Sequence, residues 1–155
     1  MTESLRERLI GAWELIDVVE QPEDGSPARH PMGEGAVGLI VYTPDGFMSV
    51  QIMQRGHAPA EASAGDPYGR TAEDFAAEAR TYFAYAGSFA VDEVARVVTH
   101  RVRTSLYPGW VGQDQRRVAR LDDDDVLELS SAEPSLSAGV PVRTRLRWRR
   151  ARALP

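Results

Sequence analysis

The chain has 155 residues, of which 43% are hydrophobic and 26% are charged, and its formal net charge is -5. This length suits one compact domain with a hydrophobic core, so we expect residues 1–155 to form a single domain. The acidic balance lacks the basic field of a nucleic-acid binder, and no apolar run approaches the roughly 20 residues that cross a bilayer. The sequence therefore predicts neither a nucleic-acid partner nor a membrane partner.

The sequence contains no cysteine, which excludes a disulfide framework and a catalytic or metal-binding thiolate. Its first residues, MTESLRERLIG, carry charge throughout and lack the apolar region of a secretion signal. Both observations favour a cytoplasmic protein.

A short helix is expected at residues 4–10, because Ser4 and Glu7 have the spacing of a capping box and Gly11 can end the turn. Such a helix can plug one end of a barrel. A strand follows from Trp13 to Glu20, although its two faces are not cleanly separated by polarity.

Residues 21–35 are dense in Pro, Gly and charge and predict a long loop. The next two segments, 36–42 and 47–53, flank the turn Thr43-Pro-Asp-Gly46. Proline presets φ and glycine accepts a positive φ, so this run predicts a β-hairpin.

A second loop at residues 54–70 leads into a helix that we expect at about 71–84. Thr71 and Asp74 have capping-box spacing, and Phe75, Ala79 and Tyr82 fall on one helical face. This helix is expected to pack across a barrel mouth or against the barrel wall.

Five further strands are expected at 87–92, 95–106, 114–121, 126–131 and 142–150. Together with the three earlier strands they predict an all-β fold, an eight-stranded antiparallel barrel. A barrel of this size is just wide enough to be filled by side chains or to hold one small ligand.

Polar residues occur at positions that face the interior of this barrel. Alternation along residues 98–106 places His100 and Thr104 on the inner face, and alternation along the next strand does the same for Gln115 and Arg117. A barrel with a polar interior is typical of a protein that holds a ligand.

Arg117 cannot shed its charge, so it needs a carboxylate, a ligand anion or a row of carbonyl groups inside the barrel. Asp17, on the face of Trp13 and Leu15, is one candidate partner. If Arg117 pairs with Asp17 or with Gln115, it belongs to a structural network near a barrel end; otherwise Arg117 contacts the ligand. His100 is either a neutral core histidine or a general acid or base, so His100 and Arg117 are the candidate catalytic residues.

Aromatic residues concentrate between Tyr82 and Trp110. They pack in the core or the barrel end, or they line a site for a planar ligand. The candidate ligand-binding residues are Gln115, Trp110, Tyr85, Tyr82, Thr104 and Tyr42.

No metal or cofactor is predicted. The three histidines lack H-x-H or H-E-x-x-H spacing, and neither a G-x-S-x-G elbow nor a glycine-rich phosphate loop is present.

An ordered series of motifs carries a family resemblance: LIGAWEL at 9–15, GLIVYTPDGFMSVQIM at 38–53, FAYAGSF at 83–89, THRV at 99–102 and PGWVGQDQRR at 108–117. Together they resemble the bacterial and fungal lipocalin-like domain family. The resemblance implies a small antiparallel barrel with an internal cavity. It leaves the function open, because some lipocalin-like barrels bind ligands and others look like cyclases or isomerases. Gly109 departs from the asparagine that is usual in this pattern.

Three functions remain open. The first is binding of a small, largely apolar or aromatic molecule, with a polar patch orienting one end. The second is a cofactor-free cyclase or isomerase that acts on a polyketide- or terpenoid-type intermediate. The third is a filled barrel that acts through its surface. A homodimer is compatible with all three.

Overall fold

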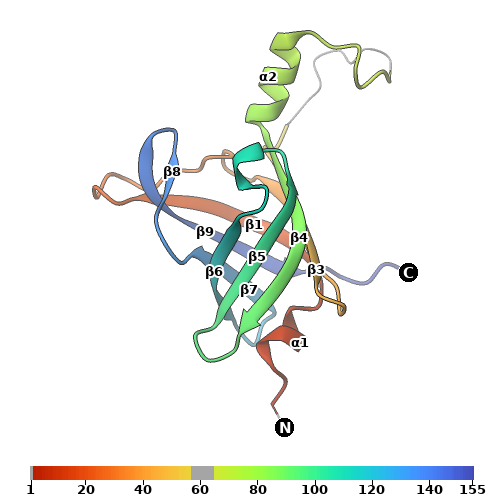
Figure 1. Cartoon of the computed structure of the whole chain (residues 1–155), viewed down its shortest axis with the longest axis vertical. Helices are drawn as coiled ribbons and strands as arrows, with labels where there is room; N and C mark the ends of the chain where they lie inside the picture. The colour runs from red at the N-terminus through yellow and green to blue at the C-terminus, as the bar shows by residue number, and fades with distance from the viewer. Residues whose placement is uncertain (1, 57–64) are drawn as a thin grey trace.

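Eight antiparallel strands pair side by side until the last meets the first, which closes the sheet into a barrel in this computed structural model (Figure 1). The structure describes residues 2–56 and 65–155. The wall consists of β1 (Gly11–Pro22), β2 (Val37–Tyr42), β3 (Phe47–Met53), β4 (Tyr82–Asp92), β5 (Val97–Ser105), β6 (Asp114–Leu121), β7 (Val126–Ser131) and β9 (Val140–Arg150). A short strand, β8 (Ser135–Ser137), pairs with β9 outside this ring. The predicted eight-stranded antiparallel barrel is confirmed.

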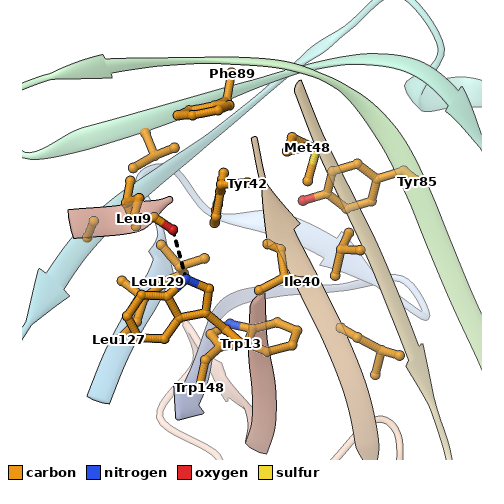
Figure 2. Packing of buried hydrophobic residues seen from close by; sticks show 14 of the residues in the cluster. Leu9, Trp13, Ile40, Tyr42, Met48, Tyr85, Phe89, Leu127, Leu129 and Trp148 are labelled. Carbon is orange, nitrogen blue, oxygen red and sulfur yellow. Dashed lines mark hydrogen bonds between the residues drawn. The ribbon is translucent and has the colours of Figure 1, made fainter. Parts of the chain in front are cut away.

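The helix α1 (Leu5–Leu9) closes one end of the barrel. Its capping box is present, with Ser4 Oγ accepting from the Glu7 amide at 3.2 Å. Leu5 and Leu9 are buried in the core, and Trp13 Nε1 donates a hydrogen bond to the Leu9 carbonyl at 2.9 Å (Figure 2). The N-terminal helix therefore plugs the barrel, as the sequence predicts.

The second helix, α2 (Ala72–Arg80), begins at the expected capping box of Thr71 and Asp74 but ends four residues earlier than predicted. Tyr82 opens β4 and pairs with Met53 of β3, and this ladder ends the helix. None of the helix residues is buried. The helix stands at the barrel end opposite α1, and its last turn reaches the barrel interior (Figure 1).

Two β-bulges decide which side chains face inward. In β1 the register shifts between Leu15 and Asp17, so Ile16 is an extra residue, Leu15 lies opposite Trp148 and Asp17 lies opposite Arg147. A bulge moves every later residue to the other face. Asp17 consequently faces outward, whereas Glu20 faces inward.

The second bulge lies where β4 meets β5, between Ala86 and Gly87. Thr104 pairs with Ala86 and Val102 pairs with Gly87, which leaves Arg103 as the extra residue. A Cβ at Gly87 would lie 1.9 Å from the Arg101 carbonyl oxygen, so this close approach requires glycine.

The predicted strand at 87–92 is the second half of β4, which begins at Tyr82, and β8 was not predicted. The predicted hairpin is confirmed. Thr43 and Phe47 are bonded across the predicted hairpin turn between β2 and β3, and Gly46 has a φ of 96°. No helix in the described ranges is long and apolar enough to cross a membrane.

Candidate ligand-binding site

The barrel encloses a cavity of about 320 Å³ near the α2 end, a volume at the lower end of the range for small-molecule sites. Its wall is largely apolar and includes Ile40, Val50, Ile52, Phe83, Trp110, Leu129, Leu146 and Trp148. The polar side chains of the wall are Glu20, Tyr82, Tyr85, His100, Arg117, Ser131 and Thr144, together with serines of β8 and Arg80 of α2. An apolar cup with a few polar groups suits a small, largely apolar ligand.

His100 lies at the cavity wall and is 1% exposed. Its Nε2 lies 2.8 Å from the Tyr42 hydroxyl, and its Nδ1 lies 2.8 Å from the Tyr85 hydroxyl. Burial, with a further contribution from the positive charge of Arg117, lowers the pKa of His100 to about 3. The imidazole is therefore neutral at physiological pH.

A neutral imidazole has one donor and one acceptor nitrogen. Tyr42 is 1% exposed, and His100 is the hydrogen-bond partner of its hydroxyl among the described residues. A buried O–H without an acceptor costs about 1–3 kcal/mol, so Tyr42 donates to Nε2. We assign the ring proton to Nδ1 on this ground, and Nδ1 then donates to Tyr85.

The Tyr85 hydroxyl accepts from His100 in this arrangement, so its own proton is free to point at a ligand. Burial raises the pKa of Tyr85 above its ordinary value of 10, and the nearby guanidinium of Arg117 opposes that rise. Burial likewise raises the pKa of Tyr42 well above 10. Both phenols are therefore protonated, and Tyr85 is a donor in the cavity wall.

Arg117 projects from β6 into the same part of the cavity. Its Nη1 donates to the Arg116 carbonyl at 3.2 Å, and no carboxylate of the described residues lies within ion-pair distance of it. The guanidinium is thus available to a ligand oxygen that carries negative charge.

The predicted pairing of Asp17 with Arg117 is wrong. Asp17 accepts hydrogen bonds from Arg147 on the outside of the barrel, and the same hydrogen bonds lower the pKa of Asp17. The bulge at Ile16 is the physical reason, because it turns Asp17 away from the face that carries Trp13.

The other candidate residues separate into three groups. Tyr82, Tyr85 and Trp110 line the cavity. Tyr42 and Gln115 do not line the cavity. Tyr42 is hydrogen-bonded to His100 Nε2, and Gln115 is the cross-strand partner of His100. Thr104 is exposed, contrary to the inward placement predicted from alternation, because the bulge at Arg103 turns it outward.

Three aromatic rings form one side of the cavity. The Trp110 ring lies edge-on to Phe83 and Tyr85, with centroid distances of 5.0 and 5.4 Å. Trp110 sits in the short 3-10 helix Pro108–Trp110 beside the barrel mouth. These rings offer flat apolar surface next to the Tyr85 hydroxyl.

Sequence reasoning missed Glu20, which is 6% exposed and lines the cavity. Its Oε2 accepts from Arg29 Nε at 2.8 Å. The signal that could have found it is the mixed polarity of β1, which marks a bulge.

Among the described residues, no group of three or more His, Asp or Glu side chains is placed to hold a metal ion. His30 lies in the loop before β2, with its Nδ1 3.2 Å from the Val18 carbonyl oxygen. His57, which the sequence places in a loop, lies outside the described residues.

Residues 10–151 match the family described as the lipocalin-like domain. The chain belongs to this family. A curated relative, the 4'-hydroxy-3'-methoxypropiophenone carrier protein ppsC of Aspergillus oryzae (strain ATCC 42149 / RIB 40), is 38% identical over 112 residues, which cover 66% of this chain and 96% of the relative. The resemblance inferred from the sequence motifs is confirmed. This lipocalin-like barrel binds a small, largely apolar molecule in its cavity.

Proposed function

We propose that this lipocalin-like protein binds and carries a small aryl ketone, and that the carbonyl oxygen of the ketone accepts a hydrogen bond from Tyr85. The observation that carries the proposal is the chain of hydrogen bonds from Tyr42 through His100 to Tyr85. It leaves the Tyr85 proton free and directs a donor at the cavity.

The ligand class follows from the shape and charge of the wall. The aromatic side formed by Phe83, Tyr85 and Trp110 suits a flat ring. Tyr85 and Arg117 offer donors and positive charge to one oxygen of that ligand. An aryl ketone combines a flat ring with such an acceptor oxygen, and the relative's name also denotes a carrier of an aryl ketone.

The same geometry favours a carrier over a cyclase or isomerase that uses His100 as its acid or base. Both ring nitrogens of His100 are engaged with tyrosine hydroxyls, and its pKa of about 3 makes it a weak base at neutral pH. His100 and Tyr85 both line the cavity, but the hydroxyl of Tyr85 occupies Nδ1 of His100, so a ligand meets no free ring nitrogen. His100 is therefore a positioning residue, which orients the Tyr85 hydroxyl through their hydrogen bond.

A cytoplasmic location and a homodimer stay predictions from the sequence. Neither affects the argument for the cavity.

Calorimetric titration tests the proposal with two ligands that differ at one group. The ketone is 4'-hydroxy-3'-methoxypropiophenone, and its partner is 2-methoxy-4-propylphenol, which has a methylene in place of the carbonyl. We expect one-to-one binding of the ketone and about tenfold weaker binding of the propylphenol, the effect of one hydrogen bond of about 1.4 kcal/mol. Absence of saturable ketone binding, or equal affinity for both molecules, contradicts the proposal.

A further inference from the structure

Glu20 presents a second polar group to the cavity, at a distance from Tyr85 and Arg117 along the wall. Its side chain is 8% exposed, and the two oxygens of its carboxylate differ in their hydrogen bonds. Oε2 accepts from Arg29, whose Nη2 also donates to the Ser137 carbonyl of β8 at 2.8 Å. Oε1 has no hydrogen-bond partner among residues 2–56 and 65–155, and it is not one of the fully buried polar atoms that lack a partner there. Because Oε1 keeps accessible surface and Glu20 lines the cavity, a donor on a ligand or a water molecule can reach it.

The strand register places Glu20 and Arg117 in one row of cross-strand neighbours. Arg117 pairs with Ser131 across β6 and β7, and Glu20 pairs with Thr144 across β1 and β9. The Thr144 amide donates to Ser131 Oγ at 2.9 Å, which joins the two pairs.

Three strand spacings of about 4.8 Å separate these two residues, or roughly 14 Å along the curved wall. Both side chains line the cavity, and Glu20 forms its ion pair with Arg29 rather than with Arg117. One substituted aromatic ring can lie between them, with an acceptor directed at one side and a donor at the other.

We infer that Glu20 is a specificity-determining residue that accepts a hydrogen bond from a hydroxyl group on the ligand's aromatic ring. The inference rests on the proposed function, because it assigns the second end of the same ligand. The preferred ligand class is then a hydroxyaryl ketone: the carbonyl faces Tyr85 and Arg117, and the phenolic hydroxyl donates to Glu20 Oε1. Arg29 holds the carboxylate in place through Oε2.

Three commercial ligands test this inference by calorimetric titration of the whole protein: 4'-hydroxypropiophenone, 4'-methoxypropiophenone and propiophenone. The first can donate at the ring position, the second carries an ether there, and the third carries nothing. We expect the hydroxy ketone to bind about tenfold more tightly than the other two, as one charge-assisted hydrogen bond implies.

Glu20→Gln replaces the carboxylate by a neutral acceptor of the same shape. A neutral hydrogen bond is about half as strong as a charge-assisted one, so the preference for the hydroxy ketone should narrow to about threefold. Glu14→Gln, on the exposed face of the same strand, is the matched control and should retain the tenfold preference.

Equal affinities for the three ketones in the unaltered protein overturn the inference and leave the proposed function standing. A tenfold preference that persists in Glu20→Gln also overturns it. Failure of all three ketones to bind overturns both proposals together. The comparison of ligands on the unaltered protein decides the matter even if Glu20→Gln fails to fold.

Discussion

The hydroxyl oxygen of Tyr85 lies 2.8 Å from Nδ1 of His100, so β4 and β5 hold one hydrogen-bonded pair at the cavity wall. The Tyr42 hydroxyl lies at the same distance from the other ring nitrogen, Nε2. Figure 2 shows both tyrosines directed into the barrel. The three residues form a chain of hydrogen bonds that ends at the cavity.

Tyr85→Phe should lower the affinity for an aryl ketone about tenfold, because it removes the proposed donor to the carbonyl. Tyr42→Phe is the matched variant, since Tyr42 lies behind His100 and outside the cavity wall. It leaves His100 Nε2 without a donor and should cost about 1–3 kcal/mol of unfolding free energy, with a smaller effect on affinity. Calorimetry and urea unfolding measure the two effects. The proposal fails if Tyr85→Phe binds the ketone as tightly as the unaltered protein.

The unfolding free energy should fall as the pH drops below 6.5. His100 has a pKa of about 3 in the folded protein and an ordinary value near 6.5 when unfolded, so the unfolded chain takes up a proton that the folded chain excludes. Between pH 7.5 and pH 5 this single group should remove about 2 kcal/mol of stability.

His100→Gln should abolish that part of the pH dependence, measured by urea unfolding at both pH values. His30→Gln, in the loop before β2, should retain it. The same loss of stability in His100→Gln and in the unaltered protein would show that His100 is not held neutral. The groups that face His100 are Tyr42, Tyr85 and Arg117, and neither phenol titrates in this range.

Arg117→Met should weaken ketone binding about tenfold while leaving stability unchanged or higher, because the guanidinium has no carboxylate partner among the described residues. Arg116→Met removes the same charge from the neighbouring position, where Arg116 is exposed and pairs with Glu133. It should leave the affinity unchanged. Equal loss of affinity in both variants would indicate a general charge effect rather than a contact in the cavity.

Trp13→Phe should destabilise the barrel by about 1–3 kcal/mol, since it leaves the buried Leu9 carbonyl without the indole donor that holds α1 in place. Thermal unfolding measures the loss. Trp110→Phe, at the opposite end, should change ketone affinity more than stability. Unchanged stability in Trp13→Phe would contradict the role given to α1.

Local chemistry was sufficient to predict the eight wall strands, the Pro-Asp-Gly hairpin and both capping boxes, because each depends on neighbouring residues. It placed the start of β4 at residue 87 instead of Tyr82, and it did not predict β8. Alternation also placed His100 and Arg117 inside, since no bulge lies between Val97 and Val102 or within the paired part of β6.

The errors trace to pairing between distant residues. The bulges at Ile16 and Arg103 reverse the faces of Asp17, Glu20 and Thr104, and each depends on the partner strand. The end of α2 depends in the same way on Tyr82 pairing with Met53. No window of local sequence contains these partners.

The measurement that tests the central claim most directly is the carbon-13 NMR shift of the ketone carbonyl in 4'-hydroxypropiophenone labelled at that carbon. In the bound state the signal should lie downfield of the signal bound to Tyr85→Phe, because a hydrogen bond from Tyr85 withdraws electron density from the carbonyl carbon. The absence of a bound signal, or the same shift in both proteins, would contradict the proposal that Tyr85 binds the ketone through its carbonyl oxygen.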